Sequence, residues 1–151
     1  MRKKISMRLM RFYNQYVFER KKESFFWTFF AFGFTVILSR LIVLDMERGK
    51  AFFGYLYIKG YHIHHFYYGI ILLILSNWLA LIRYKRLYKR LFKVITSIMF
   101  GGGLGLVVDE FGLLLTMEFG IKGNYWAPQS YYAIGVVSVV LALCLLLLKA
   151  D

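Results

Sequence analysis

Hydrophobic residues fall in long blocks along this chain and do not alternate singly with polar ones. Four blocks are each about 18–25 residues long, enough to cross the roughly 30 Å hydrocarbon core of a bilayer. They lie near residues 24–44, 64–82, 94–116 and 131–148. The pattern predicts an all-α membrane protein with four transmembrane helices in a single domain, residues 24–151.

The segment before the first block, residues 1–23, has a different pattern. Its apolar side chains recur at helical spacing, with most of the polar side chains on the opposite side; the apolar set is Ile5, Leu9, Phe12, Tyr13, Tyr16 and Val17. A basic amphipathic helix of this kind is typical of a segment that lies on a membrane surface. We therefore predict an N-terminal interfacial helix that anchors the chain. A role in binding a partner or in forming a homo-oligomer stays open.

The distribution of charge sets the predicted orientation. The chain of 151 residues is 60% hydrophobic and carries a net charge of +12, with a mean hydropathy of +0.56. Fifteen of the 20 lysines and arginines lie in residues 1–23, in the loop 83–93 and at Lys149, whereas the alternate loops carry four. This asymmetry predicts a multi-pass protein of the cell membrane with both termini in the cytoplasm. The predicted partners are the bilayer and its anionic headgroups, and not nucleic acid.

Two polar clusters interrupt this apolar background. His62, His64 and His65 are the only histidines in the chain, and Asp109 and Glu110 are its only adjacent pair of acids. Ionisable side chains are costly inside a membrane segment, so their presence there indicates a functional site. The single cysteine, Cys144, provides neither a disulfide nor a cysteine metal site within one chain.

Counting helix rise places these clusters in one layer. Asp109 lies about 22 Å along the third block from Val94, and Arg40 about 24 Å along the first block from Ser24, at roughly 1.5 Å per residue. The histidines occupy the same outer end of the second block. Three separate elements therefore deliver polar side chains to one outward-facing layer.

Glycines in the third block predict close helix packing there. Gly101, Gly105 and Asp109 recur every four residues, and Gly112 follows three later, so all four share one helical face. Gly69 shares a face with His65 in the second block. Small residues at this spacing let membrane helices approach closely. The packing face would then turn Asp109 toward the bundle interior.

Two interpretations of the polar layer stay open. In the first, His62, His64 and His65 bind a divalent metal, zinc or iron, together with Asp109 or Glu110. The other acid would then serve as a general base, and metal-activated water would hydrolyse a lipid or another membrane-associated substrate. In the second, the protein holds no cofactor and is a non-enzymatic transport or accessory subunit, and the same residues form a relay or a structural ion-pair network.

Arg40 has its own pair of interpretations. Its guanidinium either pairs with one of the acids or binds an anion such as a lipid phosphate, whose geometry it matches. Tyr125 and Trp126 are predicted to anchor the chain at the membrane interface, with a role in roofing the outward site as the alternative.

Three stretches carry a resemblance to a known family. His62-Ile-His-His-Phe-Tyr-Tyr-Gly69, the run from Gly105 to Leu115 with its Asp-Glu-Phe, and Tyr125-Trp126 resemble a family of small four-span prokaryotic integral membrane proteins. The likeness covers about residues 40–135, and it implies the four-span fold and the pairing of the two motifs without implying a reaction. A looser analogy links the site to intramembrane zinc hydrolases of the alkaline ceramidase type, whose spacing differs.

Overall fold

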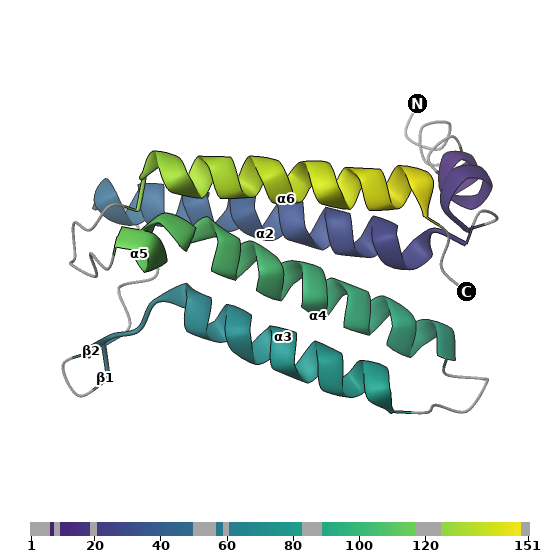
Figure 1. Cartoon of the computed structure of the whole chain (residues 1–151), viewed down its shortest axis with the longest axis horizontal. Coiled ribbons are helices and arrows are strands. Elements are labelled where there is room, and N and C mark those ends of the chain that lie inside the picture. Colours follow the sequence, from purple (N-terminus) through teal and green to yellow (C-terminus); the bar gives the residue numbers. More distant parts are fainter. Residues whose placement is uncertain are drawn as a thin grey trace.

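The computed structural model describes residues 7, 10–18, 21–49, 57–58, 61–82, 89–116 and 125–148. For residues 57–58 and 61–62 it describes the backbone alone. Four helices run side by side, alternating in direction along the chain (Figure 1): α2 (Glu23–Glu47), α3 (His65–Leu81), α4 (Lys89–Asp109) and α6 (Pro128–Leu147). These helices confirm the prediction that the fold is all-helical in its main elements.

Short elements of secondary structure lie at the two ends of this bundle. The π-helix η1 (Asn14–Phe18) lies at the end where α2 begins, and α5 (Phe111–Thr116) lies at the other end. Beside α5, the strands β1 (Tyr57–Ile58) and β2 (Tyr61–His62) pair antiparallel just before α3. Apart from these two-residue strands, the described elements are helices.

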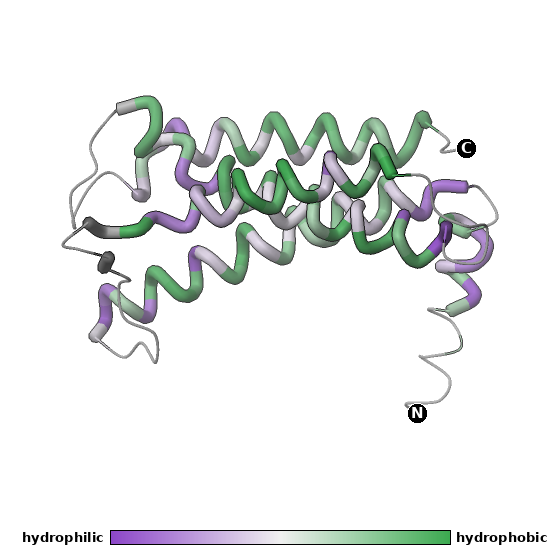
Figure 2. Tube along the Cα trace, turned by 90° about the horizontal axis from the view of Figure 1, so that it is seen from below, coloured by the Kyte–Doolittle hydropathy of each residue, from purple (hydrophilic) through white to green (hydrophobic). Residues whose placement is uncertain are grey.

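The helices are apolar along their length and polar at their ends (Figure 2). In the described residues, α2, α4 and α6 are long and apolar enough to cross a membrane, and α3 is a shorter apolar helix of 17 residues. Large hydrophobic side chains lie on the outside, with Trp78 70% exposed and Leu147 74% exposed. Such surfaces are typical of a lipid environment rather than water. The three long helices are those of a multi-pass membrane protein.

Helix α4 is the centre of the bundle and packs against α2, α3 and α6. A Cβ atom added to Gly101 would lie 2.2 Å from the carbonyl oxygen of Thr28 on α2. A Cβ atom on Gly69 of α3 would lie 2.8 Å from the carbonyl oxygen of Gly103. Both crossings therefore depend on glycine, because any larger residue would push the backbones apart.

A small hydrophobic core adjoins the end of α4. Phe32 and Val36 of α2 pack with Val108 of α4, and side chains of α6, including Ile134 and Val137, cover them. Val108 directly precedes Asp109, and Val36 lies one helical turn before Arg40. The core thus fixes the backbone that carries the polar residues.

The third apolar block forms two helices instead of the single predicted one. A turn at Glu110 separates α4 from α5, where we expected one helix over 94–116. The amide of Gly112 donates a hydrogen bond to Ser130 Oγ at 2.9 Å, which attaches α5 to α6. Gly101 and Gly105 face α2, whereas Gly112 faces Ala127 and Ser130 at the start of α6. Periodicity counted along one straight helix had no means to detect the break.

The N-terminal segment is described in part. Residues 10–18 are helical, and Ile5 and Leu9 of the predicted amphipathic face lie outside the described residues. The described helix ends at Phe18, and Lys21 lies in a turn with a φ of +54°. The amide of Lys22 donates to Val17 O at 2.9 Å and that of Lys21 to Phe18 O at 3.1 Å. This is the Schellman pattern that ends many helices, with lysine where glycine is usual.

Candidate functional site

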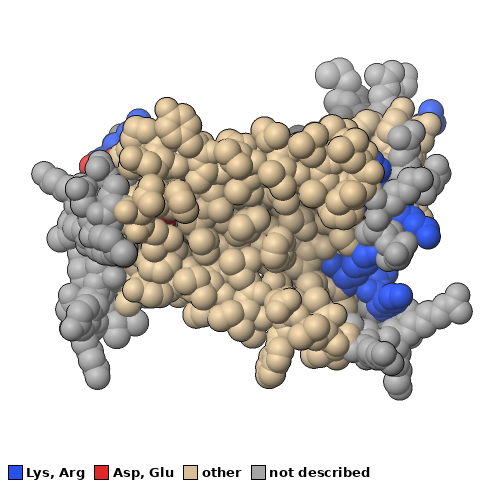
Figure 3. Space-filling view, in the orientation of Figure 1, with Lys and Arg blue, Asp and Glu red and all other residues tan. Residues whose placement is uncertain are grey.

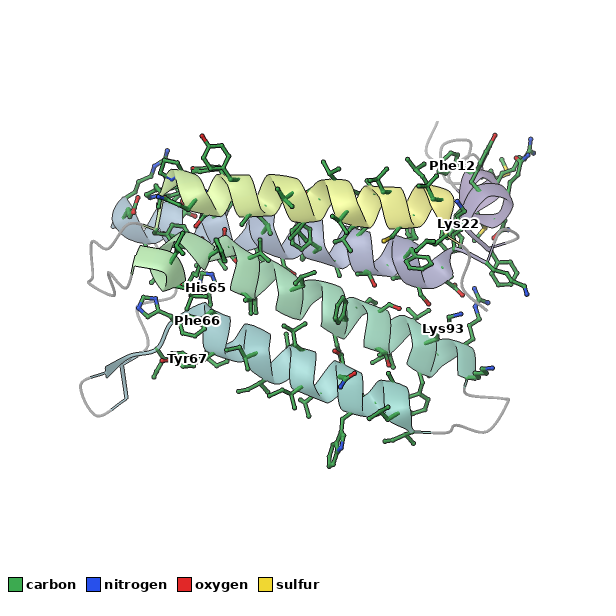
Figure 4. All side chains as sticks on the ribbon, viewed as in Figure 1. Phe12, Lys22, His65, Phe66, Tyr67 and Lys93 are labelled. Atoms are coloured by element: carbon green, nitrogen blue, oxygen red, sulfur yellow. The ribbon has the colours of Figure 1, made fainter. Side chains whose placement is uncertain are left out.

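The polar site lies at the end of the bundle where α3 begins and α4 ends. Figure 4 shows His65 and Phe66 at this end, opposite Lys22 and Lys93. The described side chains that meet here are Arg40, His64, His65, Asp109, Glu110 and Tyr125. They come from α2, from the start of α3, from the end of α4 and from the segment before α6. The side chain of His62 lies outside the described residues, so its predicted role stays a prediction.

Asp109 is the most buried member of the site, with no exposed surface. Arg40 Nε donates to its Oδ1 at 2.7 Å. His65 Nε2 lies 3.2 Å from its Oδ2, and the Tyr125 hydroxyl donates to the same oxygen. One carboxylate therefore collects hydrogen bonds from three other segments, as a buried charge requires.

Glu110 holds the start of α3. Its side chain is nearly buried, and His64 Nδ1 lies 3.0 Å from Oε1. The backbone amide of Phe66 donates to Oε2 at 3.0 Å. This amide is one of the groups at a helix N-terminus that lack a partner within the helix, and an anion is favoured there. Glu110 thus caps α3 from a distant part of the chain.

His65 connects the two acids. Its Nε2 faces Asp109, and its Nδ1 lies 3.6 Å from Glu110 Oε1. Residues 109 and 110 are consecutive, yet the turn at Glu110 lets both carboxylates approach the same imidazole. The described polar residues therefore form a continuous chain of contacts from Arg40 to His64.

Aromatic rings surround the guanidinium of Arg40. Its Cζ lies 4.2 Å from the ring centroid of Tyr131, 5.3 Å from that of Trp126 and 5.4 Å from that of Tyr125. Within the described residues, its buried Nη1 and Nη2 atoms have no hydrogen-bond partner. Cation–π attraction to three rings compensates part of their lost hydration. Trp126 is held in turn by a hydrogen bond from Nε1 to Glu47 Oε1 at 2.9 Å.

Tyr125 is a member of the site that helical counting missed. Its side chain is buried, with an edge-to-face contact to His65. Burial raises the pKa of the Tyr125 phenol, and the nearby Asp109 carboxylate raises it further. The hydroxyl therefore stays protonated and donates. The signal in the sequence was the Tyr125-Trp126 pair before Pro128, which we had assigned first to interface anchoring.

The described contacts of the two acids are all with protein groups. Among the described side chains, no group of three or more His, Cys, Asp or Glu is arranged to hold a metal. Each oxygen of Asp109 and Glu110 instead faces a protein nitrogen or hydroxyl. Both carboxylates are also buried, with Asp109 0% and Glu110 3% exposed. The prediction of zinc or iron, and that of a catalytic acid pair, therefore stay predictions.

The predicted packing glycines make close helix contacts but none of the polar side-chain contacts of the site. Gly105 faces Phe32 and Thr35 on α2, and a Cβ on Gly112 would lie 2.8 Å from Ser130 Oγ. Gly112 thereby fixes α5 against the start of α6, directly after the segment that carries Tyr125.

Comparison of the chain with protein-family models, with curated proteins and with solved structures finds no match.

Proposed function

We propose that this chain is a non-enzymatic, multi-pass subunit of the cell membrane whose polar site is an ion-pair clasp. It spans the membrane four times, with both termini in the cytoplasm, as the distribution of lysine and arginine supports. The clasp is defined as Arg40, His64, His65, Asp109, Glu110 and Tyr125. It holds the outer ends of the spans in a fixed arrangement, as an accessory subunit requires.

The observation that carries this proposal is the closure of the carboxylates. Both acids are buried, and their partners come from every main helix or its approach. A hydrolytic site needs an open position for water and substrate. A clasp needs the opposite, because its charges are stabilised by partners that exclude water.

The remaining polar side chains favour a clasp over a conducting pathway. Ser76 Oγ donates to Leu73 O at 2.9 Å, and Ser97 Oγ donates to Lys93 O at 2.8 Å. Thr28 Oγ1 donates to Ser97 O at 3.3 Å. The two serines donate to carbonyls of their own helices, and Thr28 of α2 donates across to α4. None of these three hydroxyls donates to a residue of the clasp.

A double-mutant cycle on Arg40→Met and Asp109→Leu tests the proposal. Each single variant leaves a buried charge without its partner, which costs roughly 3–5 kcal/mol of unfolding free energy. The double variant removes both charges and recovers much of that loss. The measurement is reversible unfolding in micelles, with elemental analysis of the same preparations.

The same preparations distinguish the clasp from a metal centre. If wild-type protein carries a stoichiometric divalent metal, and Asp109→Leu loses the metal while it keeps its stability, the clasp is wrong and a metal centre is right. The clasp predicts the reverse: a loss of stability with no change in metal content. His65→Gln serves as the milder variant, because it retains a side chain that can donate to Asp109.

A further inference from the structure

The opposite end of the bundle contains a hollow of about 490 Å³ between α2, α4 and Tyr13, the residue before η1. It is lined by Tyr13, Glu23, Trp27, Arg90, Leu91 and Val94. Its two charged residues, Glu23 and Arg90, lie at the starts of α2 and α4, and Trp27 and Val94 lie about one turn further along these helices. The hollow is therefore polar at its mouth and apolar along its wall.

The only acid of the hollow is already paired. Arg90 Nη2 donates to Glu23 Oε1 at 2.9 Å, and Arg90 Nε donates to Oε2 at 3.1 Å. The Tyr13 hydroxyl donates to Glu23 Oε1 at 2.6 Å and accepts from Trp27 Nε1 at 3.3 Å. This arrangement neutralises Glu23. The guanidinium of Arg90 also lies 4.5 Å from the ring centroid of Phe18. Because 61% of the Arg90 side chain is exposed, its N–H groups remain accessible to a further acceptor.

The surroundings of the hollow are strongly basic. Figure 3 shows lysines and arginines gathered at this end of the molecule. The described basic residues in these segments are Arg11, Lys21, Lys22, Lys89, Arg90 and Lys93, against the single acid Glu23. Lys22 is used internally, since its Nζ donates to Leu145 O at 2.7 Å and to Leu146 O at the end of α6. The excess positive charge of the others favours an anion at the mouth.

We infer that this hollow binds one anionic phospholipid of the cytoplasmic leaflet. The phosphate lies at the mouth against Arg90, and an acyl chain lies along Trp27, Leu91 and Val94. Guanidinium is suited to phosphate because its planar N–H groups match the oxygens. A soluble anion would leave the apolar wall uncovered, whereas a phospholipid matches both halves. The inference rests on the membrane placement proposed above and not on the clasp.

The test compares phosphatidylglycerol with phosphatidylcholine, both carrying palmitoyl and oleoyl chains, by native mass spectrometry of the full chain released from micelles. The decisive variant is Glu23→Gln with Arg90→Gln, which leaves the net charge unchanged. It is expected to lose affinity for phosphatidylglycerol by about tenfold, because the charge-assisted phosphate contact is gone. Arg11→Gln lowers the net charge at the same end outside the hollow, and is expected to change the affinity by at most about twofold.

Three outcomes would overturn the inference. If Arg11→Gln loses more affinity for phosphatidylglycerol than the double variant does, the attraction is a diffuse one to the membrane surface and not a site in the hollow. Equal retention of phosphatidylcholine and phosphatidylglycerol would mean no headgroup preference. Displacement of the lipid by excess inorganic phosphate would mean a site for a free anion. Because none of these variants alters Arg40 or Asp109, each result leaves the clasp to be judged separately.

A fluorescence measurement locates the acyl chain independently of folding. Trp78→Phe with Trp126→Phe leaves Trp27 as the only tryptophan. Phosphatidylglycerol brominated on its acyl chain should then quench Trp27 more strongly than brominated phosphatidylcholine at equal content. This difference in quenching should disappear when Glu23→Gln and Arg90→Gln are added to the same protein, and it should return when both residues are restored.

Discussion

Each end of the bundle contains an arginine–carboxylate pair, but the two pairs differ in burial. Arg40 and Asp109 have side chains that are 14% and 0% exposed, whereas Arg90 is 61% exposed beside Glu23. The first pair is one link of a closed set that includes two histidines and a tyrosine. The second pair borders an open hollow.

The difference in burial shows that an arginine–carboxylate pair can serve two different purposes. A solvent-exposed pair contributes little to stability, because water and salt screen it. A buried pair is costly to assemble and more costly to break, since one charge is then left alone. The buried pair therefore fixes the structure, and the exposed pair remains available for a ligand.

The strongest test of this comparison removes a carboxylate at each end. Glu110→Ala deprives His64 and the amide of Phe66 of their acceptor, and it should lower the unfolding free energy by roughly 3–5 kcal/mol. Glu23→Ala should have a much smaller effect, because Arg90 can turn to water. Unfolding of both variants in the same micelles measures the difference. Equal losses of unfolding free energy at the two ends would contradict the distinction between a buried pair and an exposed pair.

The second test asks how much of the cohesion comes from packing in the middle of the bundle. In Gly101→Ala the new Cβ would meet Thr28 O at 2.2 Å, so α2 and α4 must separate. We expect a loss of about 3 kcal/mol, at the upper end for overpacking. Gly135→Ala is the matched control, since nothing lies within 4 Å of its Cβ position. If both variants unfold alike, the charged ends, and not this crossing, hold the helices together.

The third test isolates one hydrogen bond of the clasp. Tyr125→Phe removes the donor to Asp109 and should cost about 2 kcal/mol, since the acceptor is charged. The pKa of the Tyr125 phenol is raised above 10.0 in the folded protein. The contribution of this hydroxyl is therefore complete below pH 10 and is lost as the pH rises through the folded-state pKa.

Unfolding of wild type and Tyr125→Phe across alkaline pH checks that sign. Their stability difference should shrink as the pH rises above 10, while the same substitution at exposed Tyr132 gives a difference near zero throughout. A difference that grows with pH would mean that the phenolate is the favoured form in the folded state.

The smallest expected effect lies at the basic end. Lys21 holds a φ of +54°, a left-handed conformation that costs a non-glycine residue about 1 kcal/mol. Lys21→Gly should therefore raise the unfolding free energy, but by less than about 1 kcal/mol, because glycine also increases the conformational entropy of the unfolded chain. Lys89→Gly, with the same loss of charge at the first residue of α4, should be destabilising instead. A loss of stability in both would show that the charge of Lys21 matters more than its backbone.

Much of the fold could be predicted because it depends on local pattern. The second block, expected over residues 64–82, forms α3 over His65–Leu81, and the first block forms α2 over Glu23–Glu47. Helix rise alone placed Arg40 and Asp109 in one layer, and the structure puts Arg40 Nε 2.7 Å from Asp109 Oδ1. Regular helices make depth a linear function of residue number.

The sequence by itself determined which segments are apolar helices and which residues carry charge into them. Only the tertiary structure decided that Glu110 ends α4, caps α3 and shares His65 with Asp109, and that Tyr125 completes the set. These contacts join residues 16 to 46 positions apart. Local propensity does not encode such distances. The contacts depend on the close approach of neighbouring helices that the glycines of α4 allow, and on the turn that places Glu110 outside the helix.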